Sequence, residues 1–205
     1  MSSFKTLFIS LVATTSLLTI STTAHADLMM GSTFFEPSIG YKTESLKLTD
    51  KLANETSIQM NTPVYGLKIG YRSMLGIDVN LAGDYASGKA SYSPLQEKNS
   101  FSHTSVALQL GVSALDLMKI YLGYAFLNDL KIETGLLNSD ITLKGPAYQA
   151  GVQFKLFSGV FVAAQYNLNQ FKTISGKSYT IGDSIEQYYS KLDSQDYSFN
   201  ISTSF

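Results

Sequence analysis

Eight segments of this chain alternate, residue by residue, between an uncharged apolar face and a face of polar and small side chains. A two-residue period is the signature of a β-strand whose two faces meet different surroundings. Segments of about ten residues have the length of a tilted membrane-spanning strand. The sequence therefore predicts an all-β protein, an eight-stranded antiparallel up-and-down transmembrane β-barrel. Its strands are expected near residues 33–42, 62–72, 76–86, 102–113, 117–127, 145–157, 160–169 and 197–205.

The connections between these segments alternate in length. Short ones are expected near residues 73–75, 114–116 and 158–159, and long polar loops near residues 43–61, 87–101, 128–144 and 170–196. Outer-membrane barrels have short periplasmic turns and longer external loops, so the two ends are called the turn end and the loop end below. A soluble barrel such as a lipocalin would also alternate, with its apolar face inward. In that case the face rich in Gly, Ala and Ser would be in contact with water. This face has few charges, which is unusual for a surface in contact with water.

Aromatic residues recur at two levels of the predicted barrel. Aromatic rings gather at both interfaces of a membrane, where one edge is apolar and the hydroxyl stays hydrated. Two such belts favour a membrane barrel over a soluble one. The loop-end belt would contain Tyr41, Tyr65, Tyr85, Tyr124, Tyr148, Tyr166 and Tyr197, and the turn-end belt Phe35, Tyr71, Phe154 and Phe205.

The first 26 residues have the pattern of a secretory signal peptide. One lysine precedes a mostly apolar stretch from Leu7 to Ile20, and Ala24-His25-Ala26 fits a cleavage site. The stretch is shorter than the ~20 apolar residues of a spanning helix. We expect residues 1–26 to be removed, leaving residues 27–205 as one barrel domain. The chain has no cysteine, which excludes disulfides, thiolate metal sites and a lipid anchor on cysteine.

The inward face of the predicted barrel carries charge near the turn end. An eight-stranded barrel encloses a space that side chains just fill, and buried charges need partners or water. A salt-bridged plug is the favoured interpretation, and a pore lined by the same residues is the alternative. Inward-facing glycines are compatible with both interpretations: they would leave room for water in a pore, or allow tight curvature of a closed barrel. The charged set is Glu36, Arg72, Asp78, Lys119 and Lys155.

No constellation of residues predicts an enzyme, a cofactor site or a metal site. His103 is the single histidine after residue 26, and loop carboxylates such as Glu44 and Asp193 are interpreted as solvated surface. His103 and Ser105 resemble the His-x-Ser pair of an outer-membrane lipid A deacylase family. They are predicted to face inward, away from lipid, and Glu133 lies in a predicted loop, so a nucleophile, base and acid are not brought together. The near-neutral charge of −1 suggests no nucleic-acid partner.

The last predicted loop, residues 170–196, contains aromatic and branched side chains. Exposed apolar residues there would mark an adhesive surface. The alternative is that the strands simply continue above the membrane. The residues concerned are Tyr179, Ile181, Ile185, Tyr188 and Tyr189.

From residue 33 to 205 the chain resembles the small bacterial outer-membrane barrels, the OmpA transmembrane domain and the OmpX/Ail group. The resemblance implies a Gram-negative outer-membrane location, contact with outer-membrane lipid and a monomer. It also implies that the alternating closing segment is the signal read by the barrel-assembly machinery, through Tyr197, Phe199, Ile201 and Phe205. Three functions follow from it: a structural and surface-interaction protein whose loops contact a surface ligand or host factor, a narrow porin-like channel, and a lipid-modifying enzyme. We expect the first.

Overall fold

The computed structural model describes residues 31–93, 98–114, 117–134, 139–176, 179–187 and 189–205. Residues 33–205 form one compact unit. The predicted signal peptide, residues 1–26, lies outside the described residues and stays a prediction. Among the residues described, no helix is both long and apolar enough to cross a membrane.

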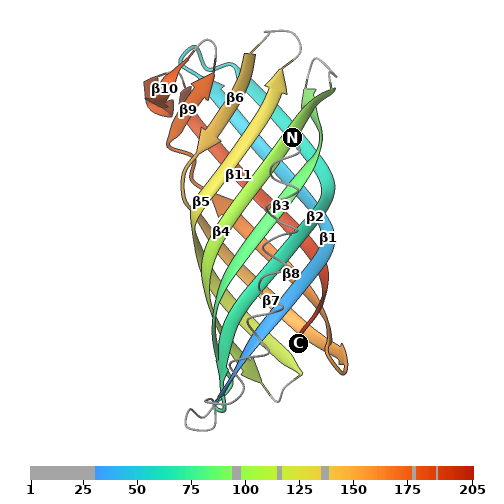
Figure 1. Ribbon diagram of the computed structural model, residues 1–205. Coiled ribbons are helices and arrows are strands. Elements are labelled where there is room, and N and C mark those ends of the chain that lie inside the picture. The colour runs from blue at the N-terminus through green and yellow to red at the C-terminus, as the bar shows by residue number, and fades with distance from the viewer. Residues whose placement is uncertain (1–30, 94–97, 115–116, 135–138, 177–178, 188) are drawn as a thin grey trace. The chain divides into compact units, whose positions relative to one another are not determined.

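Eight strands close into an antiparallel barrel, as predicted (Figure 1). The sheet runs in the order β1-β2-β3-β4-β5 on one side and β1-β11-β8-β7 on the other, and β5 pairs with β7 to close it. The strands are β1 (Gly31–Asp50), β2 (Glu55–Ser73), β3 (Ile77–Ser93), β4 (Lys98–Ala114), β5 (Met118–Thr134), β7 (Ala147–Phe157), β8 (Val160–Asn169) and β11 (Tyr189–Thr203).

The seam between the first and last strands keeps one register from Ser38 to Thr49 and shifts by one residue at Asp50. Ser38 lies opposite Ser202, and the same register brings Phe35 opposite Phe205, where the two residues exchange backbone N–H···O bonds of 3.2 and 3.0 Å. Lipid offers no partner to a backbone N–H or C=O group, so pairing of this seam is required for a stable barrel.

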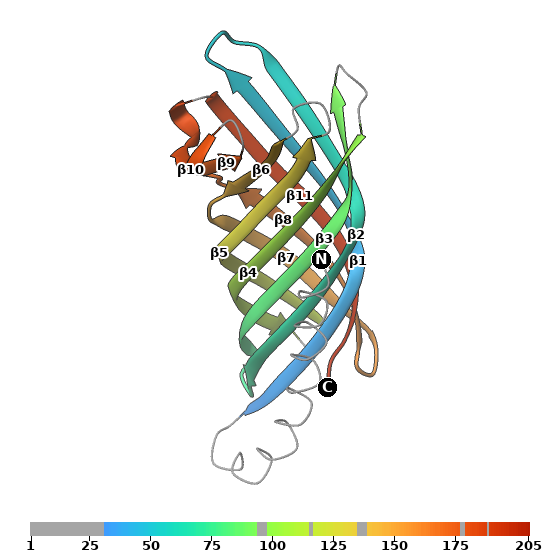
Figure 2. The ribbon, with the colours of Figure 1, turned by 45° about the horizontal axis from the view of Figure 1, so that its top comes forward.

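Most of the four predicted long loops are strands, which corrects that part of the sequence interpretation. β1 continues to Asp50 and β2 starts at Glu55, so a turn of Lys51–Asn54 replaces the loop expected at residues 43–61. β3 and β5 likewise run on, to Ser93 and Thr134. Figure 2 shows three further short strands at this end, β6 (Ser139–Lys144), β9 (Thr173–Gly176) and β10 (Tyr179–Ser184), followed by the 3₁₀ turn η2 (Ile185–Gln187).

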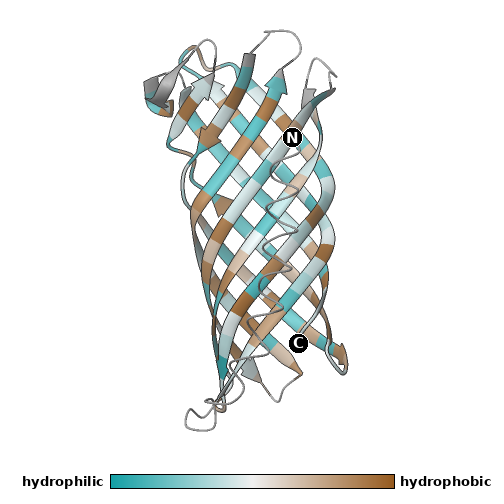
Figure 3. Ribbon diagram, viewed as in Figure 1, coloured by the Kyte–Doolittle hydropathy of each residue, from teal (hydrophilic) through white to brown (hydrophobic). Residues whose placement is uncertain are grey.

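The exposure of side chains confirms the predicted facing of the strands. Leu122 and Phe199 are 65% and 72% exposed on the outer surface, whereas Gln109 and Asp78 are at most 1% exposed inside. Figure 3 shows the resulting alternation of hydrophobic and hydrophilic residues along the strands. Tyrosines of the loop-end belt lie opposite one another across strand pairs, namely Tyr65 and Tyr85, Tyr124 and Tyr148, and Tyr166 and Tyr197.

Beyond this tyrosine belt the inward face becomes apolar. The strand extensions there stand in water, so their polar side chains turn outward and their apolar ones pack inside, as in a soluble barrel. We call the buried group the loop-end core. It contains Leu46, Ile58, Met60, Ala90, Phe101, Leu130, Ile132, Leu143, Phe171, Ile174 and Ile185.

A β-bulge in β5 marks this change of polarity. Val106 of β4 lies opposite Leu127, but the next residue, Ala107, lies opposite Ala125, so Phe126 is an extra residue. Phe126 and Leu127 are consequently both exposed. After the bulge the even-numbered residues of β5 face inward, which places Leu130 and Ile132 in the loop-end core.

Replacing Leu122 with Arg is expected to lower the free energy of unfolding in lipid vesicles by about 2–4 kcal/mol, because the charge enters the middle of the apolar band. The control is Leu75→Arg, since Leu75 is 85% exposed in the turn between β2 and β3. That change should cost only about 0–1 kcal/mol. Urea titration of both variants in vesicles measures the difference, and equal losses would show that Leu122 does not face lipid.

Candidate functional site in the barrel lumen

Four of the five predicted lumen charges lie together inside the barrel near the turn end. Arg72 donates to Asp78 through Nε at 2.9 Å, and Lys119 Nζ lies 3.1 Å from the other oxygen of Asp78. Both cations also lie 5.3 Å from the centre of the Phe34 ring, a cation–π distance. Asp78 is completely buried. A buried carboxylate needs a partner, and two cations balance the charge of this one.

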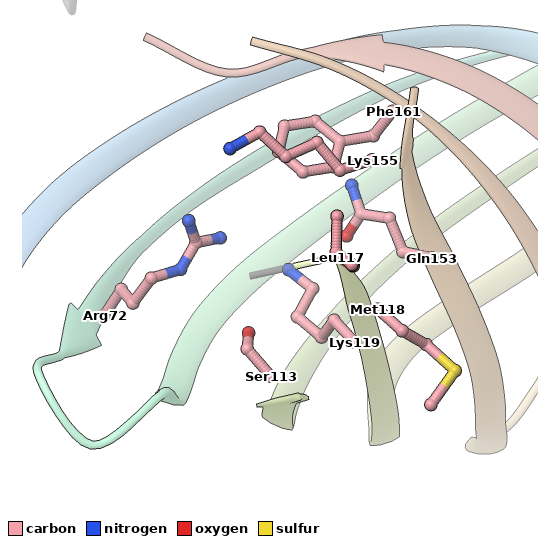
Figure 4. A pocket seen from close by; sticks show the side chains of 8 residues that line it. All are labelled: Arg72, Ser113, Leu117, Met118, Lys119, Gln153, Lys155 and Phe161. Carbon is pink, nitrogen blue, oxygen red and sulfur yellow. The ribbon is translucent and has the colours of Figure 1, made fainter. Parts of the chain in front are cut away.

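Glu36, the fourth of these charges, is bound by neutral donors. Its Oε1 accepts hydrogen bonds from Gln153 Nε2 at 2.8 Å and from the Ser202 hydroxyl at 2.9 Å. Lys155, the fifth predicted residue, is exposed at the end of β7. Figure 4 shows it beside the same turn-end cavity that Arg72 and Lys119 line.

Side chains fill the lumen where its glycines leave room. A Cβ atom added to Gly151 would lie 2.3 Å from Tyr121 Cζ, so the ring occupies the space that the missing side chain leaves. The Tyr121 hydroxyl donates to Gln165 Oε1 at 2.9 Å, and Lys68 Nζ lies 4.4 Å from the ring centre. At this level the Tyr121 ring and the Lys68 side chain therefore both occupy the lumen.

A second ionic group in the lumen lies closer to the loop end, and we call it the Lys42 cluster. Lys42 Nζ lies 3.1 Å from Asp196 Oδ2, 3.3 Å from Glu44 Oε2 and 2.7 Å from His103 Nδ1. The same His103 nitrogen is 2.7 Å from Glu44 Oε2. Nδ1 therefore accepts from Lys42 when the ring is neutral and donates to Glu44 when it is protonated.

Amide side chains complete the hydrogen bonds of the Lys42 cluster. Asn128 Oδ1 lies 2.5 Å from His103 Nε2, and Asn128 Nδ2 donates to Asn169 Oδ1 at 3.2 Å. Asn169 and Asn167 both donate to Asp196, at 3.0 and 2.5 Å. Each of these side chains is buried, so the network is satisfied by protein groups inside the lumen.

Glu44, His103 and Asp196 include the ligand types of a metal site, and their candidate atoms lie within 4.8 Å of one another. The Lys42 ammonium, however, already lies among the three and supplies positive charge. Lys42 thus forms ion pairs with both carboxylates of this group, at 3.1 and 3.3 Å.

This cluster lies beyond the predicted end of the first strand at Lys42. Glu44, expected in a solvated loop, is 1% exposed inside the barrel. Continuing the two-residue period past Lys42 would have placed Glu44 and Leu46 on the inward face.

The hydrolase-like pair does not form a catalytic arrangement. His103 is 2% exposed and held by Lys42, Glu44 and Asn128. Glu133 lies on the exposed outer face of β5. A lipid substrate on the outer surface would not contact His103.

The residues predicted to form the insertion signal lie on the outer face of the closing strand, except Phe205, which lies just beyond its end. Tyr197, Phe199, Ile201 and Phe205 are exposed, while Ser198 and Ser202 between them are buried. These side chains form an apolar stripe on the outer face, and their role as an insertion signal stays a prediction.

Changing Asp196 to Ala is expected to reduce the free energy of unfolding by about 3–5 kcal/mol, because it leaves a buried ammonium and two amides short of a partner. Asp193→Ala on the same strand is the matched control. Asp193 pairs with Lys191 at 2.7 Å in an exposed position, where a pair contributes no more than about 1 kcal/mol. Thermal or urea unfolding in vesicles compares the two, and similar losses would contradict the structural role of the Lys42 cluster.

Comparison with known proteins agrees with this architecture. The family model for the outer membrane protein beta-barrel domain matches residues 10–205. Ail, the attachment invasion locus protein of Yersinia pestis, is similar with a TM-score of 0.54 and 17% identity over 86% of this chain and 100% of that one. Its complex with the heparin analogue sucrose octasulfate gives 0.53 and 16% over the same shares. AlkL, solved by solid-state NMR in DMPC bilayers, gives 0.50 and 17% over 86% of this chain and 91% of AlkL.

None of the curated proteins compared with the chain matches it. At these identities the solved structures support the fold, and the family model supports the membership. The apolar outer face, the closed eight-stranded sheet and the match over most of the sequence lead to one conclusion: the chain belongs to the outer membrane protein β-barrel family and resides in the outer membrane.

Proposed function

We propose that this protein is a surface-interaction protein with a closed lumen, which holds its loop-end strands rigidly outside the membrane to contact a ligand or host factor. The observation that carries the proposal is the loop-end core. Its eleven members are at most 6% exposed and come from β1, β2, β3, β4, β5, β6, β9 and the segments beside them. A packed core of this kind orders the external strands and blocks the lumen at the same time.

The outer face of these strands supports recognition by mixed polar contacts. Lys131 lies 2.7 Å from Asp140, and Lys144 lies 3.1 Å from Asp129, all on the outside of β5 and β6. Ile185 and Tyr189 belong to or pack against the loop-end core, so the adhesive apolar surface expected there is not formed by these two residues. Side chains of Tyr179 and Ile181 and the whole of Tyr188 lie outside the described residues.

The barrel of Ail, which has the same fold, was solved with a heparin analogue bound. That complex supports a ligand-binding role for a barrel of this fold. The near balance of lysines and carboxylates on the present loop end favours a neutral or mixed-charge partner over a polyanion. The buried, fully bonded state of His103 supports a non-enzymatic role. Insertion by the barrel-assembly machinery and a monomeric state complete the proposal.

Attachment of bacteria to immobilised matrix proteins and glycans tests the proposal. Cells producing the protein should attach more strongly than cells lacking it. A variant that joins Ser87 to Ser102, which are paired across β3 and β4, through an Asn-Gly turn should lose that gain. Its level in the outer membrane must match that of the unaltered protein.

Planar-bilayer recording of the refolded protein is the control that separates this function from a channel. The unaltered protein should give no reproducible conductance steps. Stepwise conductance without any gain in attachment would favour the porin-like function instead.

A further inference from the structure

A cavity of about 180 Å³ lies inside the barrel at the turn end. Figure 4 shows that its side chains come from the ends of several strands, with the head groups of Arg72, Lys119 and Lys155 around one space. Ser113 and Gln153 add polar atoms to the lining. At about 30 Å³ for each water molecule in the liquid, the cavity has room for several waters or for a small polyatomic ion.

The charge of this lining is positive. Among the described residues that line the cavity, three are cations and none is a carboxylate. Asp78 lies completely buried beside it and pairs with Arg72 and Lys119, which leaves the cavity with an excess of positive charge. Glu36 is also buried: Gln153 and Ser202 donate to its Oε1, and its Oε2 has no hydrogen-bond partner among the described residues, so one carboxylate charge offsets part of the positive charge.

Several donors around the cavity have no hydrogen-bond partner among the residues that the structure describes. Arg72 engages Asp78 through Nε at 2.9 Å and through one terminal nitrogen at 3.3 Å, so three of its five N–H groups are left. Within the described part of the chain, the Lys155 ammonium has no carboxylate at ion-pair distance, in contrast to Lys119.

The positions of the two inner cations are fixed before any ligand arrives. Arg72 and Lys119 are both held by Asp78 and by the face of the Phe34 ring. A fixed guanidinium fork with neighbouring ammonium groups is the donor set that proteins use for phosphate.

We propose that the turn-end cavity binds a phosphate group from the periplasmic side, with Arg72, Lys119 and Lys155 as its ligands. The group comes either from a free phosphate compound or from the head group of an inner-leaflet phospholipid. In both cases the chemistry is the same: oxygens of a phosphate accept charge-assisted hydrogen bonds from the three cations. The proposal is independent of what the loop end contacts.

Titration of the full refolded protein with inorganic phosphate tests this site. The protein is held in a nonionic maltoside detergent, and binding is followed by ³¹P NMR. We expect saturable binding that weakens about tenfold in Lys155→Gln, the lower end of the loss expected from one hydrogen bond to a charged group. Lys155 is exposed at a strand end, so this variant should fold. Lys172→Gln makes the same change of charge at an exposed loop-end position and should leave the affinity unchanged.

A second arm identifies the source of the phosphate. Binding of inorganic phosphate is compared between detergent micelles and bilayer nanodiscs of phosphatidylglycerol. If the protein binds phosphate in micelles but not in nanodiscs, the lipid head group is the ligand. If it binds phosphate in both, the ligand is a free phosphate compound. The proposal is overturned if phosphate does not saturate the protein in micelles, or if Lys155→Gln and the unaltered protein bind it equally.

Discussion

The structure depends on one constraint: in the hydrocarbon of a membrane, every backbone N–H and C=O group has to find its partner within the protein. The pairing of β5 with β7 and of β1 with β11 satisfies it by leaving no open edge along the spanning strands. Closure with eight strands then fixes a narrow lumen, and the two-residue period sends every second side chain into it. The lumen is therefore crowded by geometry, whatever the function of the protein.

The surroundings of the barrel decide which residues face this lumen at each level. In the lipid band the outer face is apolar. The inner face contains charged side chains that form ion pairs and amides that donate hydrogen bonds to them, as in the Lys42 cluster. Above the tyrosine belt the outer face meets water, and the order is reversed around the loop-end core. One sheet thus joins the membrane form and the soluble form of a β-barrel, and the change of polarity occurs within continuous strands such as β1. This continuity makes the external strands an extension of the membrane anchor.

The spanning part of the fold was predictable from the sequence because lipid imposes a strict rule on it. Leu108, Leu122 and Phe199 face outward as expected, and the inward position of Glu36 and Asp78 followed from the same alternation. The external strands were mistaken for loops because the rule of a charge-free face ends at the membrane boundary, while strand pairing continues. The bulge at Phe126 had no sequence signal, since Phe126 and Leu127 both suit a lipid-facing position. The contacts of Lys42 with Asp196 required the register of β1 against β11, which no local pattern contains.

Site-directed spin labelling along β5 tests the reversal of polarity most directly. The chain has no cysteine, so a single introduced cysteine at each position from Met118 to Thr134 takes the label alone. Up to Phe126, labels at even-numbered positions should be relaxed by oxygen dissolved in the lipid. From Leu127 onward, labels at odd-numbered positions should be relaxed by a water-soluble nickel chelate, and those at positions 128, 130 and 132 should be shielded from both. An alternation that keeps one phase through residue 134, or strong access of the nickel chelate at positions 130 and 132, would contradict the inverted barrel.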